Sequence, residues 1–389
     1  MEAFSAAKLT KALVQIESTD PGAYETAIGD YIFRQLSALP GIIPGKTLRK
    51  SEVLPDRFNL MAELPGSDLS APALIFICHM DTVVVGDGWS MPPLNAIEKD
   101  GRIYGRGACD MKSGLACCIS AFAAAAERRH KTGELPHRTL KLICTVDEED
   151  FMRGCEAAIR DGWVSEKDWV LDAEPTNGQI QVAHKGRTWF EITVTGQTAH
   201  ASTPWKGADA IAAMAEIICH IRREIKAAPS HPDLGFSTVT FGQITGGYRP
   251  YVVPDSCKLW IDMRLVPPTD TKKAEEIVAR AITLAEKEIP GIRASYAITG
   301  SRPYIERDDA SPLLSLLRRT CGDVTGTEAV VSYFPGYTDT AVIAGTLHNH
   351  NCMSYGPGNL ECAHQPDEWV SLDDISRCEA VYRRLALET

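Results

Sequence analysis

The stretch IFICHMDTVVVGDGW (residues 75–89), followed by GRIYGRGACDMK (residues 101–112), decides the fold and the site. Its first four residues predict a buried strand, and His79 and Asp81 follow where that strand ends. The second part leads into a long alanine-rich helix, with Asp110 at the amino end of the helix. Side chains at the carboxyl ends of strands in an open α/β sheet face a ligand crevice. The stretch therefore predicts a pocket that gathers one histidine and two aspartates.

These residue types suit a metal ion. Neutral imidazole and carboxylate are zinc ligands, and the second ring nitrogen of a ligating histidine is normally held by a nearby acceptor, for which Asp81 is the candidate. A lone histidine after a strand is more often a hydrogen-bonded loop residue, and a lone aspartate at a helix start is usually an N-cap. The metal hypothesis therefore depends on the rest of the chain.

Length and composition set the class of protein. A chain of 389 residues exceeds the usual span of one hydrophobic core, so two domains are expected. Apolar residues at 44% and charged residues at 23% are typical of a globular protein. The net charge of -11 argues against nucleic acid or an anionic membrane surface as a partner.

Location is inferred from what the sequence lacks. We find no secretory leader and no apolar run near the roughly 18 residues of a membrane span, which predicts a cytoplasmic protein. The 12 cysteines form no CxxC pair, so buried reduced thiols are expected and a cysteine-based redox protein is disfavoured.

Two further apolar strands run into acidic residues. Residues 139–146 precede the run DEED at 147–150, and residues 169–171 precede a run that contains Glu174. Four adjacent carboxylates repel one another, and at a strand end they need a compensating cation unless the loop is simply solvated. Strands that alternate with helices predict an α/β protein with a mostly parallel sheet and its site at one edge.

The pattern of apolar and polar residues changes from residue 183. Residues 187–194 alternate like a half-exposed strand, and residues 237–244 and 257–265 also read as strands. Two amphipathic helices are expected, the second over residues 273–289. The first of them presents one apolar face, made of Ile211, Ala215, Ile218, Ile221 and Ile225. Residues 183–296 therefore predict an α+β insertion in a main domain built from residues 1–182 and 297–389.

Five motifs then occur in order: HxDTV at 79–83, GRGxxDMK at 105–112, DEE at 147–149, EPT at 174–176 and AHQPDE at 363–368. In sequence and spacing they resemble the dinuclear-zinc amidohydrolase family. That family includes acetylornithine deacetylase, succinyl-diaminopimelate desuccinylase, aminoacylase and glutamate carboxypeptidase. The resemblance covers nearly the whole chain and implies that the insertion is a dimerisation (lid) domain.

The resemblance implies a pair of divalent metal ions. Asp110 would bridge the ions, His79 and Glu174 would complete one ion, and Glu149 and His364 would complete the other. Zinc is expected, with cobalt or manganese as alternatives.

Catalytic roles follow from the same resemblance. Asp81 would orient His79, and Glu148 would be the general base that takes a proton from water and passes it to the leaving amine. His200 would stabilise the oxyanion across a dimer interface, although a surface-loop histidine is the alternative.

Substrate-binding residues are also implied. Arg264 resembles an arginine that pairs with the substrate carboxylate, although an arginine at a strand end is as often structural. Gly336 and Thr338 fall in a loop that resembles part of the substrate pocket. Many relatives carry Asn at the position of Tyr251, so the resemblance does not transfer a substrate.

The function implied is hydrolysis of the amide bond of a small N-acylated amino acid by a homodimer. Residues 183–186 and 363–368 look closest to acetylornithine deacetylase. A dipeptidase or carboxypeptidase of the same family is the alternative, and a non-catalytic relative is a further one. The acyl group is not specified by the sequence.

Overall fold

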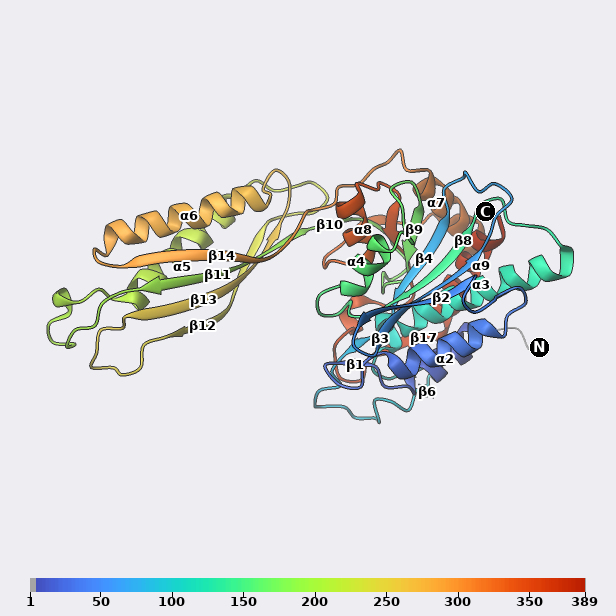
Figure 1. The fold of residues 1–389 in the computed structure, drawn as a ribbon, viewed down its shortest axis with the longest axis horizontal. Helices are drawn as coiled ribbons and strands as arrows, with labels where there is room; N and C mark the ends of the chain where they lie inside the picture. The colour runs from blue at the N-terminus through green and yellow to red at the C-terminus, as the bar shows by residue number, and fades with distance from the viewer. Residues whose placement is uncertain (1–4, 389) are drawn as a thin grey trace. The chain divides into compact units, whose positions relative to one another are not determined.

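The computed structural model describes residues 5–388, which form two compact units (Figure 1). The main unit comprises residues 5–182, 307–334 and 338–388. The inserted unit comprises residues 183–306 and 335–337.

The main unit is built on a sheet of eight strands. Their bounds are β2 Leu48–Leu54, β3 Arg57–Leu64, β4 Leu74–His79, β8 Leu140–Thr145, β9 Trp169–Asp172, β10 Ile180–His184, β15 Val331–Phe334 and β16 Cys352–Ser354. The strand order is β15-β10-β16-β9-β4-β8-β3-β2. The central strands β8, β4, β9 and β16 run parallel, and β3, β2 and β10 add antiparallel pairs toward the edges.

Helices cover both faces of the central strand β4. Those of the main unit are α1 Ala6–Val14, α2 Thr26–Ser37, α3 Ser113–Thr132, α4 Arg153–Arg160, α7 Pro312–Thr325, α8 Asp339–Leu347 and α9 Leu372–Glu388. Every residue of β4 is buried, as expected for a parallel strand packed on both sides. Helix α3 packs on β4 and also contacts α1 and α9, whereas α8 packs on β4 and also contacts α4 (Figure 1).

Helix α3 and the turn before it form an apolar segment, Ala108–Thr132, that is long enough to cross a membrane by length and composition. The expectation that no apolar run has this length was therefore wrong. Most of the segment is buried inside the protein, 94% of its most apolar window, because it packs between α1, α9 and the sheet. Its composition is that of a core helix.

Two small sheets complete the main unit. Their strands are β1 Thr19–Asp20, β5 Thr82–Val83, β6 Ile97–Lys99, β7 Arg102–Tyr104 and β17 Trp369–Ser371. Strand β1 pairs with β5, directly after the end of β4. Strand β17 pairs with β7, which brings the segment after residue 363 beside the segment before Asp110.

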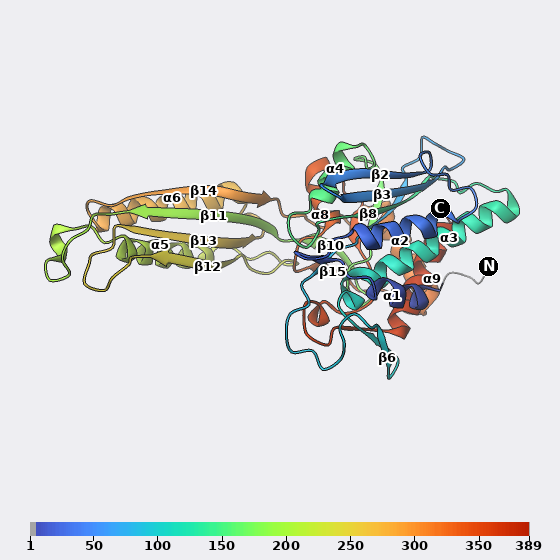
Figure 2. The same ribbon diagram turned by 60° about the horizontal axis from the view of Figure 1, so that its bottom comes forward.

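The inserted unit is an antiparallel sheet with two helices on one face. Its elements are β11 Gly186–Thr195, α5 Ala210–Ala227, β12 Thr238–Gly246, β13 Ser256–Leu265, α6 Thr271–Glu288 and β14 Arg293–Arg302. The strand order is β12-β13-β11-β14, and Figure 2 shows α5 and α6 along the same side of these strands. Alternate residues of β11 and β13 are buried under the helices. Strand β14 continues past residue 296, where the sequence places the end of the insertion.

The buried face of α5 differs from the predicted one. Residues Ala210, Ala213, Met214, Ile217, Ile221 and Ile225 are buried. Ile211, 41% exposed, and Ala215, also exposed, belong to the predicted apolar face but lie outside the buried one. The apolar residues of this helix form two overlapping stripes, and only contact with the sheet selects one of them. The main unit is α/β, with a sheet that is parallel through its centre, and the inserted unit is α+β. This architecture confirms the predicted fold class.

Candidate metal centre

The predicted metal ligands of the main unit come from the ends of strands and from two turns. His79 is the last residue of β4, Glu149 follows β8, and Glu174 follows β9. Asp110 lies in the turn that leads into α3, where its backbone (φ -117°, ψ 104°) departs from helical angles. His364 lies in the loop before β17, with φ 62°. We call these five residues the ligand cluster.

One half of the ligand cluster is buried. The Nε2 atom of His79 lies 3.1 Å from Asp110 Oδ1 and 3.7 Å from Glu174 Oε1. The His79 side chain is 1% exposed and the Glu174 side chain 5%. These three residues form the buried half.

The other half reaches the surface. The Nε2 atom of His364 lies 3.0 Å from Glu149 Oε2 and 3.5 Å from Asp110 Oδ2. The His364 side chain is 47% exposed, whereas Glu149 is 7% exposed. These residues form the open half, and Asp110 belongs to both halves because each of its oxygens faces one histidine.

The spacing of these atoms fits metal coordination. Ligands held tetrahedrally at about 2.0–2.2 Å from zinc lie about 3.3–3.6 Å from one another. The nitrogen to oxygen distances of both halves, 3.0 to 3.7 Å, bracket that range. The donor set, one imidazole and carboxylates in each half, is one that zinc accepts. The residues present therefore fit a pair of divalent ions.

The electrostatics of the cluster favour cations. Burial raises the pKa of Glu174, and the nearby charge of Asp110 raises it further. The pKa of His364 is raised to about 10 by its bonds to Asp110 and Glu149. Burial would lower the pKa of His79, yet the bond to Asp110 raises it well above its usual value. The carboxylates therefore favour positive charge at this site, which metal ions would supply in place of the imidazole protons.

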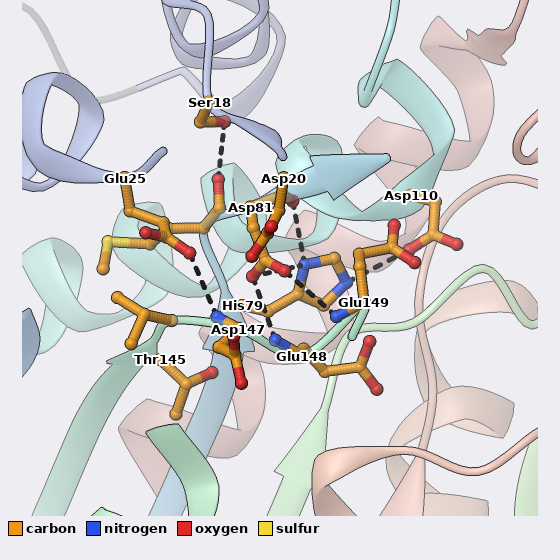
Figure 3. A network of polar contacts seen from close by, with 12 residues as sticks. Ser18, Asp20, Glu25, His79, Asp81, Asp110, Thr145, Asp147, Glu148 and Glu149 are labelled. Atoms are coloured by element: carbon orange, nitrogen blue, oxygen red, sulfur yellow. Dashed lines mark hydrogen bonds and ion pairs between the residues drawn. The ribbon is translucent and has the colours of Figure 1, made fainter. Parts of the chain in front are cut away.

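Asp81 supports the cluster from behind, and its backbone carbonyl is the acceptor that lies beside His79. His79 Nδ1 lies 3.0 Å from the backbone carbonyl oxygen of Asp81, and its distance to the Asp81 carboxylate is 3.7 Å. That carboxylate instead accepts the N–H groups of Glu148, at 3.2 Å, and Glu149, at 3.0 Å. Asp81 therefore links the end of β4 to the acidic loop after β8 (Figure 3).

Fixed charges stand behind this loop. Arg57, on β3, donates to Glu25 at 2.6 Å and to Asp20 at 2.6 Å, and all three side chains are buried. Glu25 accepts the N–H of Asp147 at 3.0 Å, a contact drawn in Figure 3. Asp20 and Glu25 also lie near Asp81, but the guanidinium between them already supplies a compensating charge. This network fixes the turn from which Glu148 and Glu149 project.

Glu148 lies beside the ligands without sharing their contacts. A carboxylate oxygen of Glu148 lies within 4.8 Å of the ligand atoms of His79 and Glu174. The side chain is buried, and burial raises its pKa well above the usual value. Such a carboxyl group, close to a metal site and able to hold a proton, has the properties of a general base and acid.

Four of the predicted site residues belong to the inserted unit. His200 is exposed, and its Nδ1 lies 2.8 Å from Ser202 Oγ. Tyr251, 59% exposed, follows a turn whose backbone pairs with the His200 loop, since its carbonyl accepts the N–H of Ala201. Their roles stay predictions.

Arg264 and Gly336, also in the inserted unit, have different surroundings. Arg264 donates to both carboxylate oxygens of Asp262, at 2.8 and 3.0 Å, so its guanidinium already has an acidic partner. Gly336 belongs to the short segment 335–337. A role for either residue in binding substrate stays a prediction.

Thr338 lies in the main unit but is buried. Its hydroxyl is 2.8 Å from that of Thr340, which donates to Asp172 at 2.8 Å. The side chain therefore belongs to a polar network beneath the strand ends, and contact with a substrate stays a prediction.

Several supporting residues were not assigned from the sequence. Glu368 is 1% exposed and contacts the turn of Asp110, and Arg57 and Glu25 form the buried charge network. Glu368 belongs to the motif at 363–368, which was a signal that the side chain has a role. Glu25 and Arg57 carry no such signal, because charged residues just before a helix or at the start of a strand usually face solvent.

Relatives of known name resemble this chain over most of its length. A "probable succinyl-diaminopimelate desuccinylase" of Staphylococcus aureus (strain N315) is 28% identical over 371 residues, 87% of this chain and 88% of that protein. An acetylornithine deacetylase of Proteus mirabilis (strain HI4320) is 31% identical over 327 residues, 81% of this chain and 78% of that protein.

Solved structures share the fold. Aminopeptidase PepT from Bacillus cereus matches with a TM-score of 0.77 at 21% identity, covering 98% of this chain and 97% of that one. The Bacillus subtilis YXEP protein, described as a dinuclear metal binding peptidase from the M20 family, matches with a TM-score of 0.69 at 16% identity, covering 98% and 96%. Residues 75–388 match the sequence pattern of one family. The chain belongs to the peptidase family M20/M25/M40.

Proposed function

We propose that this protein is a two-metal hydrolase that cleaves the amide bond of N-acylated amino acids. The observation that carries the proposal is the placement of Asp110, whose two oxygens face His79 on one side and His364 on the other. One carboxylate between two histidines, each with a further carboxylate, is an arrangement that suits a pair of ions.

The five residues of the ligand cluster would hold the ions, with zinc as the expected metal and cobalt or manganese as alternatives. When bound, such ions polarise a scissile carbonyl and lower the pKa of a water molecule toward neutrality. The residues of the chain supply the rest of the chemistry.

Glu148 would move the proton. Its carboxylate lies near both His79 and Glu174 but makes no hydrogen bond to them within the described chain. It is therefore available to take a proton from the attacking water and deliver it to the leaving nitrogen. The N–H bonds from Glu148 and Glu149 to Asp81 would keep the two adjacent side chains in their separate roles.

Substrate recognition would involve the inserted unit. His200 would stabilise the oxyanion, and Arg264 would bind the free carboxylate of the substrate in exchange for Asp262. Tyr251, Gly336 and Thr338 would shape the pocket for the side chain or acyl group. The relatives named as desuccinylase and deacetylase support an N-acyl amino acid as the substrate class.

A homodimer in the cytoplasm is part of the proposal. Strand β12 lies at the edge of its sheet and is exposed along most of its length, which offers unpaired backbone groups to a second copy. Ile244 on this strand is 53% exposed. We expect sedimentation velocity to find a dimer and the variant Ile244→Lys to weaken it. All twelve cysteines are free, which supports a reducing compartment.

The test is release of free amine by the zinc-loaded protein from N-acetyl amino acids, N-succinyl amino acids and dipeptides. Glu148→Gln is expected to lose about a hundredfold to ten-thousandfold in turnover while it keeps both ions. Asp150→Asn is the matched control, because Asp150 belongs to the same acidic loop but its side chain is 50% exposed.

Each outcome of this test has a meaning. Cleavage of N-acyl amino acids that disappears in Glu148→Gln supports the proposal. Cleavage of dipeptides alone would favour the peptidase of the same family. Two bound ions with no cleavage of either class would favour a non-catalytic relative.

A further inference from the structure

Glu368 stands out among the buried charges that the proposed chemistry does not use. Its side chain is 1% exposed and lies just before β17, four residues after His364. Each of its oxygens accepts two hydrogen bonds from the turn that carries Asp110. Oε1 accepts the N–H groups of Cys109, at 2.8 Å, and Asp110, at 3.0 Å. Oε2 accepts a hydrogen bond from Nη1 of Arg106, at 2.6 Å, and one from the N–H of Gly107, at 3.1 Å.

The turn needs this support because it leaves helical geometry where Asp110 stands. Gly107 has φ 80°, a conformation that favours glycine, and Asp110 is extended. Three N–H groups of one turn converge on one carboxylate, which is a nest that holds an anion. The N–H of Asp110 itself is one of the three, so Glu368 fixes the residue whose carboxylate faces both histidines.

The backbone of Glu368 adds a second attachment. Its carbonyl accepts the N–H of Gly105 at 2.9 Å, and the next residue, Trp369, pairs with Tyr104. Arg106 donates a further bond to the carbonyl of Val85. The segment with His364 and the turn with Asp110 are therefore joined at Glu368 through both main chain and side chain.

We propose that Glu368 is a positioning residue of the metal centre, which places Asp110 between the two histidines and so sets the affinity for both ions. This inference rests on the proposed two-metal function. Metal ligands must be held within about 0.5 Å of their working position, and loss of an outer partner typically costs about tenfold to a hundredfold in metal affinity.

The variant Glu368→Gln tests this role. Glutamine keeps the shape of glutamate but has one oxygen and one NH2 group. Whichever way the amide turns, its NH2 group meets N–H donors. Asp367→Asn is the matched control, because it makes the same charge change one residue away while its oxygen can still accept the N–H of Ser90.

The measurement is titration of the metal-free proteins with Co²⁺. Binding is monitored by calorimetry and by the absorption spectrum of the bound ion, and thermal unfolding is measured in parallel. We expect the wild-type protein and Asp367→Asn to bind two ions alike. We expect Glu368→Gln to bind both ions about tenfold to a hundredfold more weakly, with an altered spectrum, while its metal-free form remains folded.

The outcomes separate this inference from the proposed function. If the wild-type protein does not bind two ions, the two-metal function itself fails. If it binds two ions and Glu368→Gln binds them equally well, Glu368 does not position Asp110. Should Glu368→Gln not fold, the double variant Arg106→Met with Glu368→Met removes the buried ion pair at similar volume. Weak metal binding by the folded double variant supports the inference, and native affinity or failure of this variant to fold overturns it.

Discussion

The buried half and the open half of the ligand cluster use similar side chains in different settings. His79 ends the central strand of the sheet, is 1% exposed, and has its second ring nitrogen fixed by the Asp81 carbonyl. His364 stands on a loop and is 47% exposed. The sheet therefore forms one half in advance, whereas the other half depends on a surface loop. We therefore expect the two ions of the proposed centre to be held with unequal strength.

Asp110 is shared by the buried half and the open half, so a change at this residue should affect both ions. Asparagine in its place would offer one oxygen and one NH2 group, and the NH2 group cannot bind an ion. We expect Asp110→Asn to lose both ions and to reduce hydrolysis to background. Metal analysis of the purified protein together with amine release checks this. Asp100→Asn, at an exposed turn, is the control, and retention of one tightly bound ion by Asp110→Asn would contradict a shared ligand.

The charges behind the acidic loop provide the next test. Arg57 compensates Asp20 and Glu25, and methionine in its place would leave buried carboxylates unpaired. We expect Arg57→Met to lower the free energy of unfolding by about 3–5 kcal/mol. Arg49→Met, on the neighbouring strand, removes an exposed pair with Glu63 and should cost at most about 1 kcal/mol. Urea unfolding of both variants decides whether the two differ.

His200 belongs to neither half of the ligand cluster. A variant of His200 therefore tests whether residues outside the cluster contribute to the reaction. If His200 stabilises the oxyanion, His200→Ala should lower turnover about a hundredfold to a thousandfold and leave both ions in place. Steady-state kinetics with metal analysis measures this. Unchanged turnover would remove His200 from the mechanism without affecting either half.

The smallest expected effect concerns the release of metal. Because His364 is half exposed and His79 is enclosed, the ion of the open half should leave first when a chelator is added. We expect two phases in stopped-flow release of Co²⁺, and the faster phase should be absent in His364→Ala. A single phase for both ions would show that exposure does not govern their release.

Strand ends in an α/β sheet carry recognisable signals, and these indicated part of the cluster. The complete ligand set, which includes His364 on its loop, was implied by the family resemblance. His79, Glu149 and Glu174 each follow an apolar strand, and Asp110 precedes an apolar helix. The parallel strands β4, β8 and β9 and the two helices of the insertion were predicted for the same reason, since their apolar periodicity is local, whereas β16 was not predicted.

The remaining features depend on contacts between distant segments. The buried state of Glu25 follows from its pairing with Arg57, and the role of Glu368 follows from the pairing of β17 with β7. The face of α5 is selected by the sheet beneath it. Hydrophobic pattern alone cannot specify such choices, because two registers or two partners satisfy it equally well.

The most direct test of the shared centre is a crystal of the zinc-loaded protein measured at the zinc absorption edge. We expect two anomalous peaks, one beside His79 and Glu174 and one beside Glu149 and His364, with the Asp110 carboxylate between them. A single peak, or peaks away from Asp110, would contradict this expectation.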